Sequence, residues 1–144
     1  MPLLSDKMTS PGTIISSHCL IFRGQKILLI RKNFSADYFA GKWNLPGGKI
    51  KPSEEVVAGT TREIWEETKL KVKIFSCQQI DQKIIDFGKH QGKTLIRYLC
   101  QAKSTQGQPK LSKEHLKYRW LRPQEALKLN LEPDIQKDLK SMFC

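Results

Sequence analysis

Two apolar runs near the start of the chain place the strongest constraint on its fold. Thr13–Phe22 is rich in β-branched and apolar residues, and Lys26–Arg31 has the sequence KILLIR. Only Arg23-Gly24-Gln25 separates them, and a short glycine-containing connection between two such runs is typical of a β-hairpin. The chain is therefore predicted to contain a sheet with two neighbouring antiparallel strands at its start.

Proline and glycine divide the rest of the chain into further elements. Pro46-Gly47-Gly48 predicts a turn, and Pro52-Ser53-Glu54-Glu55 predicts a helix start with Ser53 as the cap. That helix is expected to run to about Thr68. Further strands are predicted at Leu70–Phe87 (with a bend near Asp81), Lys93–Ala102 and Leu116–Leu121, and further helices at Pro123–Leu129 and Pro133–Met142. Strands interleaved with helices indicate the α/β class.

The length and the ends of the chain predict a simple organisation. With 144 residues, we expect a flexible N-terminal arm at 1–12 and a single domain at 13–144. No apolar run approaches the ~20 residues needed to cross a bilayer, and the N-terminus lacks the pattern of a secretory signal. A cytoplasmic protein without a membrane partner is therefore expected. The chain has four widely spaced cysteines, Cys19, Cys77, Cys100 and Cys144. They are predicted to be reduced thiols.

The charge of the chain favours an anionic partner. Lys and Arg number 25 against 14 Asp and Glu, a formal net charge of +11. Such a surplus suits phosphates, nucleotides, nucleic acid or an acidic membrane. The segment Gly48–Leu70 differs, with four basic residues against five glutamates. The acids are thus concentrated in one helix of a basic protein.

A helical wheel at ~100° per residue separates the two faces of this helix. A core-facing arc is predicted for Val57, Ala58, Thr61, Ile64, Trp65 and Thr68. Glu63, Glu66 and Glu67 lie on the opposite face, with Gly59 among them, and their i, i+3, i+4 spacing makes them neighbours. Uncompensated carboxylates suit hard divalent cations, which take oxygen ligands. The alternative is a solvated acidic face. Gly59 is expected to leave a bare surface that a substrate can approach.

Gly48–Leu70 resembles the Nudix box, whose pattern is G-x5-E-x7-R-E-U-x-E-E-x-G-U, with U an aliphatic residue. Eight of nine specified positions match, namely Gly48, Glu54, Arg62, Glu63, Ile64, Glu66, Glu67 and Leu70. Lys69 departs from the pattern, because the family usually has Gly there. That glycine helps to end the helix, so the departure concerns the C-cap and not the metal site. With Trp43-Asn44-Leu45-Pro46-Gly47 and the hairpin before it, the likeness covers about residues 13–130.

The resemblance implies a Nudix-type α/β/α sandwich with a mixed β-sheet and a catalytic loop–helix–loop. It implies Mg2+-dependent (or Mn2+-dependent) hydrolysis of the pyrophosphate bond in a nucleoside diphosphate linked to a group X. By position, the metal ligands are Gly48, Glu63, Glu66 and Glu67, and a supporting ion pair is formed by Glu54 and Arg62. The candidate catalytic residues are Glu66, Glu67 and Glu114. The general base is either a box glutamate or Glu114 from a distant loop.

The substrate is harder to predict. Candidate substrate-binding residues are Arg31, Lys42, Lys49 and Tyr98, for which structural packing is the alternative role. The Pro-Gly-Gly turn favours a nucleoside triphosphate or an ADP-ribose-like nucleotide. The segment Leu111–Leu127 instead looks like asymmetric diadenosine tetraphosphate hydrolases, although those enzymes usually carry Lys and His where this chain has Gly47 and Gly48.

A different class of function remains as an alternative, a non-catalytic module of the same fold that binds a nucleotide or RNA. The expected partner is a small nucleotide substrate, and a nucleic acid is the less favoured partner. The oligomeric state and the number of metal ions stay open.

Overall fold

The computed structural model describes residues 12–144, so the predicted N-terminal arm lies outside the described residues except for Gly12. The elements, in chain order, are β1 (Thr13–Arg23), β2 (Lys26–Lys32), β3 (Trp43–Asn44), β4 (Gly47–Lys49), α2 (Val56–Thr68), β5 (Lys73–Ile84), β6 (Thr94–Lys103), β7 (His115–Leu121), α3 (Pro123–Ala126) and α4 (Pro133–Phe143).

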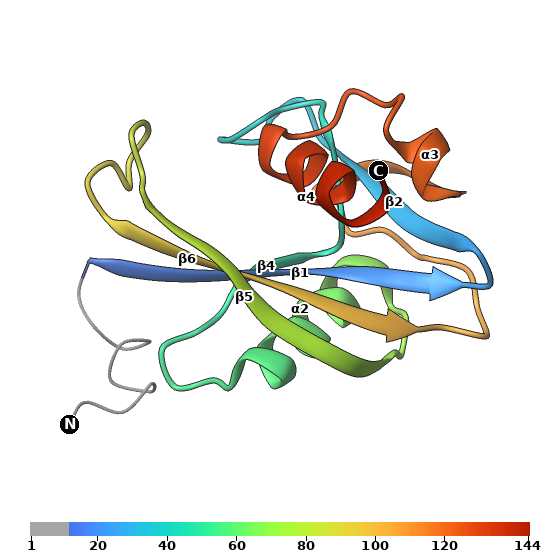
Figure 1. Cartoon of the computed structure of the whole chain (residues 1–144). Coiled ribbons are helices and arrows are strands. Elements are labelled where there is room, and N and C mark those ends of the chain that lie inside the picture. Colours follow the sequence, from blue (N-terminus) through green and yellow to red (C-terminus); the bar gives the residue numbers. More distant parts are fainter. Residues whose placement is uncertain (1–11) are drawn as a thin grey trace.

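The strands form one mixed seven-stranded sheet (Figure 1). Its main path is β3-β2-β1-β6-β5, with β4 also pairing with β1 and β7 with β2. β1 and β6 run parallel, while β2 and β4 are antiparallel to β1. The predicted hairpin is confirmed, since Phe22 lies opposite Ile27. The predicted α/β class with a mixed sheet is confirmed as well.

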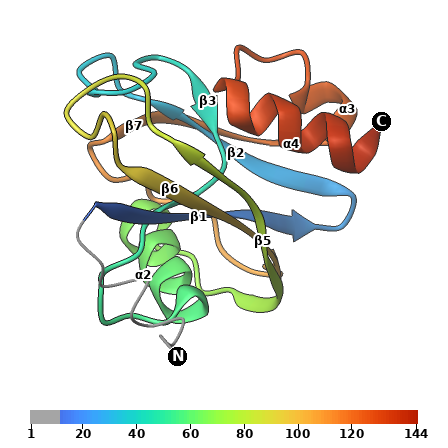
Figure 2. The same cartoon turned by 60° about the vertical axis from the view of Figure 1, so that its left-hand side comes forward.

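Helices cover both faces of this sheet, with α2 on one side and α3 and α4 on the other (Figures 1 and 2). β2 shows how the sequence supports two cores. Ile27 and Leu29 pack in the core that also contains Ala126, Ile135 and Leu139, whereas Leu28 and Ile30 pack with Ile64 of α2. All four are fully buried. The unbroken apolar run KILLIR thus results from a strand that is covered on both faces.

Several element boundaries differ from the sequence predictions. The helix α2 begins at Val56 rather than at Pro52, its N-cap is Glu55, and no side chain caps it. Gly47 and Gly48, predicted to lie in a turn with Pro46, belong to the short strand β4, which pairs with β1. α3 ends at Ala126 instead of Leu129. The bend near Asp81 is confirmed by a register shift in the pairing of β5 with β6.

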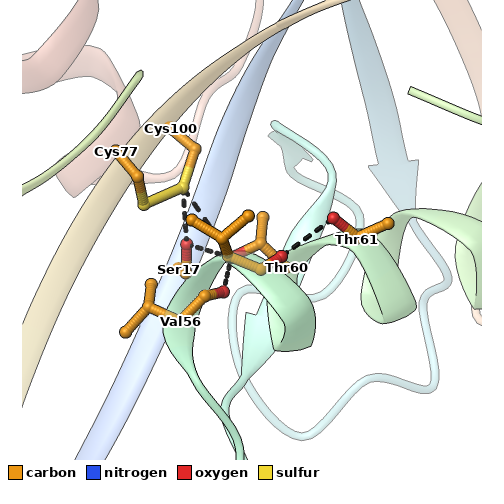
Figure 3. Close-up of a disulfide and its surroundings, with 7 residues drawn as sticks. Ser17, Val56, Thr60, Thr61, Cys77 and Cys100 are labelled. Carbon is orange, nitrogen blue, oxygen red and sulfur yellow. Dashed lines mark hydrogen bonds between the residues drawn. A yellow bond between two sulfur atoms is a disulfide. The ribbon is translucent and has the colours of Figure 1, made fainter. Parts of the chain in front are cut away.

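The prediction of four reduced thiols is wrong for one pair. Cys77 and Cys100 are joined by a disulfide between β5 and β6 (Figure 3). They lie directly opposite each other in the antiparallel pairing, a proximity that their separation of 23 residues conceals. Cys19 and Cys144 are free. Within residues 12–144, no helix combines the length and apolar character needed to span a membrane.

Candidate metal and substrate site

The site begins at the short strand β4, which lies between β3 and α2 in the chain. Gly48 on β4 pairs with Ser17 of β1, and this pairing brings its backbone against the side chain of Glu63. A Cβ atom at Gly48 would lie 2.7 Å from the Glu63 carboxyl carbon, so a side chain there would displace this carboxylate. The glycine therefore allows the backbone and the carboxylate to approach each other.

The buried face of α2 differs from the predicted arc. Its buried residues are Val56, Gly59, Thr60, Ile64, Glu67 and Thr68. Ile64 and Thr68 were predicted correctly, but Val57, Ala58, Thr61 and Trp65 are exposed. The wheel placed the arc over Val57, Ala58 and Trp65, which are apolar but exposed, and left out Thr60, which is buried. The buried hydroxyl of Thr60 is not left without a hydrogen bond, since it donates to the Val56 carbonyl or the Ser17 hydroxyl (Figure 3).

The expectation that Gly59 leaves room for a substrate is also wrong. The loop before the helix occupies that space. A Cβ at Gly59 would lie 2.8 Å from Ile50 Cδ1 and 2.9 Å from Glu54 Oε1. The missing side chain thus lets Ile50 pack and lets Glu54 reach over the helix towards Arg62.

Arg62 joins three box glutamates. Its Nε and its second terminal nitrogen donate to the two oxygens of Glu54 at 2.7 and 2.9 Å, a forked geometry that lysine cannot form. The other terminal nitrogen donates to Glu63 at 3.1 Å and to Glu66 at 2.9 Å. The hydrogen bonds from Arg62 lower the pKa of Glu54 to about 2. The predicted supporting pair is therefore in contact, and it also orients two of the predicted metal ligands.

Glu67 lies in a different environment from Glu54. Its side chain is buried, and its Oε1 accepts a hydrogen bond of 2.9 Å from the backbone N–H of Gly47. Burial raises the pKa of Glu67 well above its usual value, the Gly47 N–H opposes this, and the charges of Glu63 and Glu114 raise it further. Burial also raises the pKa of Glu63. Arg62 offsets part of this rise at Glu63, and a divalent cation would supply further positive charge to both carboxylates.

The loop before β7 brings Glu114 to the same place. Its backbone carbonyl accepts a hydrogen bond of 2.9 Å from the N–H of Asn33. Glu67, Glu114 and His115 each offer a ligand atom within 4.8 Å of the others. His115 was missed by the sequence analysis, because a single histidine next to Glu114 carries no recognisable spacing. Burial, and then the charge of Lys32, lowers the pKa of His115 to about 4.

These groups line one cleft of about 790 Å³. Of the predicted site residues, those that line it are Gly48, Lys49, Glu63, Glu66, Glu67 and Glu114. Arg31, Lys42 and Tyr98 are not among its lining residues. Arg31 donates to the Gly41 carbonyl at 2.9 Å, Lys42 contacts Asn130, and Tyr98 packs against a small apolar cluster.

The cleft also has a polar end that the sequence analysis missed. It is formed by His18, Lys32, Asn44 and Glu132. Burial lowers the pKa of His18 to about 3, so its imidazole is neutral. Asn44 lies 3.4 Å from that ring, and Lys32 lies 3.3 Å from Glu132. No sequence signal distinguished these residues, because each is isolated within a strand or loop.

The donors in the cleft fit a hard divalent cation. Three box carboxylates and Glu114 place oxygen atoms of the kind that such a cation prefers in the cleft, and the Gly48 backbone lies against one of these carboxylates. His115 adds a second kind of donor, since its Nδ1 is buried and has no hydrogen-bond partner within the described part of the chain. The burial that raises the pKa of Glu63 and Glu67 is the condition that a bound cation relieves.

Comparison with known proteins agrees with this geometry. A solved MutT protein from Methanosarcina mazei is 31% identical, with a TM-score of 0.75, over 91% of this chain and 92% of that chain. A "MutT-like protein" from Streptomyces ambofaciens is 28% identical over 60% of this chain and 51% of its own length. The mouse bis(5'-nucleosyl)-tetraphosphatase (asymmetrical) is 30% identical over 60% of both. The aligned part thus spans about half to three-fifths of these two curated relatives. The family model of the NUDIX domain matches residues 13–142, and the chain belongs to the NUDIX family.

Proposed function

We propose that this protein is a Mg2+-dependent (or Mn2+-dependent) hydrolase of the pyrophosphate bond in a nucleoside diphosphate linked to X. The observation that carries the proposal is the position of Glu67, which is buried, held by Gly47, and grouped with Glu114 and His115 in the cleft. The proposed metal ligands are Glu63, Glu66, Glu67 and the Gly48 carbonyl. A divalent cation bound there supplies the positive charge that offsets the phosphates.

The side chains of the protein then hold the reacting groups. Arg62 orients Glu63 and Glu66 through its hydrogen bonds. Water adds to one phosphorus while the bond from that phosphorus to the bridging oxygen breaks, and the bridging oxygen leaves with the other phosphate. Glu114 lies in the cleft and is proposed to accept the proton that the water loses. A box glutamate, Glu66 or Glu67, is the alternative base.

The favoured substrates are a nucleoside triphosphate and an ADP-ribose-like nucleotide. The Pro46-Gly47-Gly48 turn supports both, and the relative named as an asymmetrical tetraphosphatase supports a dinucleoside polyphosphate as second choice. A non-catalytic nucleotide- or RNA-binding module has less support, because such a module has no need for a complete carboxylate set. A cytoplasmic location belongs to the proposal, and a reducing compartment would convert Cys77 and Cys100 to thiols.

A substrate panel tests the proposal. The purified protein is incubated with nucleoside triphosphates, 8-oxo-dGTP, ADP-ribose, diadenosine polyphosphates and capped RNA, with Mg2+, with Mn2+ or with EDTA. We expect release of a nucleoside monophosphate from at least one substrate with a divalent cation and none with EDTA. RNA binding that falls steeply with salt, without hydrolysis of any substrate, would instead favour the binding module.

A further inference from the structure

We infer that Lys49, which lines the cleft, and Lys89 and Lys93, on the turn that brings His90 against Lys49, bind a phosphate that lies beyond the scissile linkage. The inference rests on the proposed function and narrows its substrate class. The favoured group X is one that carries a phosphate of its own, as in a nucleoside triphosphate or a dinucleoside polyphosphate. A sugar-linked nucleotide such as ADP-ribose would leave this basic cluster without a ligand.

The contacts within the basic cluster are incomplete without an anion. Lys49 Nζ lies 2.8 Å from His90 Nε2, and Lys93 Nζ lies 3.2 Å from His90 Nδ1. A neutral imidazole has one lone pair and one N–H, whereas an ammonium group only donates. One of the two contacts therefore brings two donors together. A phosphate oxygen accepts from both and resolves this conflict.

Positive charge in the basic cluster is not neutralised by the protein. Within residues 12–144, none of its three lysines has a carboxylate oxygen within 4 Å. Desolvation, together with the charges of Lys49, Lys93 and Lys89, also lowers the pKa of His90, which keeps that ring neutral. Two ammonium groups, those of Lys49 and Lys93, thus share one partner that cannot compensate them, and Lys89 adds a third positive charge next to His90 in the chain.

The basic cluster is continuous with the candidate metal site. Lys49 follows Gly48 on β4 and lines the same cleft as Glu63 and Glu66. The carboxylates and the ammonium groups therefore occupy two neighbouring parts of one cleft. A polyphosphate chain that reaches its cations at the box extends naturally to the lysines, because each phosphate adds negative charge.

The turn that carries Lys89, His90 and Lys93 is held in place before any ligand arrives. The Gly92 N–H donates to the Ile85 carbonyl at 2.8 Å, which closes the turn. The ring of Phe87 packs edge-on against Tyr38, with centroids 5.5 Å apart, and against Phe39 at 5.8 Å. Tyr38 itself lines the cleft. The backbone of this turn thus loses little conformational entropy on binding.

Selectivity between substrates tests the inference. The double variant Lys89→Ala/Lys93→Ala is compared with Lys26→Ala/Lys128→Ala, which removes the same charge from two exposed lysines elsewhere. For each protein, kcat/KM is measured for ATP, diadenosine tetraphosphate and ADP-ribose. We expect the ratio of the polyphosphate value to the ADP-ribose value to fall at least ~10-fold in the first variant and to stay constant in the second. An unchanged ratio in the first variant would overturn the inference.

A binding measurement keeps the inference separate from the proposed hydrolysis. Inorganic tripolyphosphate is titrated into the intact protein with EDTA present, and the imidazole C–H signals of His90 are followed by NMR. We expect saturable shifts in the wild type that the Lys89→Ala/Lys93→Ala variant lacks. Binding here without turnover of any substrate would refute only the proposed hydrolysis. No shift, or tighter binding of an unphosphorylated RNA oligonucleotide than of tripolyphosphate, would refute the polyphosphate site.

Discussion

The backbone N–H of Gly47 donates a 2.9 Å hydrogen bond to Oε1 of Glu67 near the end of α2. This bond links the Pro-Gly-Gly segment to α2 and fixes one oxygen of a buried carboxylate. The other oxygen lies 3.9 Å from Nε2 of His115. Glu67 therefore has a defined orientation in the cleft although it makes no ion pair with Arg62.

Glu67→Gln is expected to lower kcat at least ~100-fold while leaving the fold intact. The amide oxygen of the variant keeps the bond from Gly47, but the neutral group is a poor metal ligand. The measurement is kcat at saturating Mg2+ on a confirmed substrate, alongside a thermal melt. The matched control is Glu55→Gln, an exposed residue at the start of the same helix. Near-normal turnover in Glu67→Gln would show that the metal site is assigned wrongly.

Arg62→Lys tests whether the forked contact with Glu54 orients the other glutamates. Lysine keeps the charge but loses the two parallel bonds, so we expect kcat to fall about 10-fold and stability by about 1–2 kcal/mol. Glu54→Gln should have a similar effect through the same contact. The double variant should then cost less than the two single effects added together. Additive losses would mean that the two residues act independently.

Lys69→Gly is expected to stabilise the protein by about 0.5–1 kcal/mol. Lys69 ends α2 with φ 58°, a left-handed conformation in which glycine carries no steric penalty. The loss of the Lys69 ammonium 5.3 Å from the Trp65 ring offsets part of this gain. Urea unfolding near neutral pH measures the change. Lys71→Gly is the control, because Lys71 has an ordinary negative φ, and it should not stabilise.

Gly59→Ala is expected to destabilise the protein by about 1–3 kcal/mol, even though alanine favours helices by about 1 kcal/mol. The new methyl would meet Ile50 Cδ1 and Glu54 Oε1 within 3 Å. Activity should fall as well, since displacement of Glu54 releases Arg62. Chemical unfolding and kcat measure the two effects. A variant more stable than the wild type would contradict this prediction. It would show that a methyl group at position 59 meets neither Ile50 nor Glu54.

His18 predicts a specific acid sensitivity. Its pKa is about 3 in the folded protein, lowered mainly by burial, against 6.5 as the ordinary value. The unfolded chain therefore binds more protons between these two values, so stability falls as the pH decreases from 6.5. By about pH 5 the loss due to His18 is at most about 2 kcal/mol. His18→Gln should lose less stability than the wild type between neutral pH and about pH 5 in urea unfolding. Parallel losses would exclude His18 as the source.

The sequence alone determined the parts of this protein that depend on local pattern. The hairpin, the helix around Ile64 and the C-terminal helices follow from periodicity and from glycine and proline, which act within a few residues. The spacing of Glu63, Glu66 and Glu67 placed three carboxylates together because one helix turn brings such positions together. The match to the Nudix box required no tertiary information.

Only the tertiary structure decided which distant residues meet. Gly47 reaches Glu67, Glu114 and His115 reach Glu67, and Cys77 faces Cys100, and each of these contacts joins residues more than 15 positions apart in the chain. The tertiary structure also buries Gly59, which was expected to be bare, and exposes Val57 and Trp65, which were expected in the core. Burial on α2 depends on what packs against each position and not on apolarity alone. A side chain's neighbours are fixed by sheet register, and register emerges only when the whole chain folds.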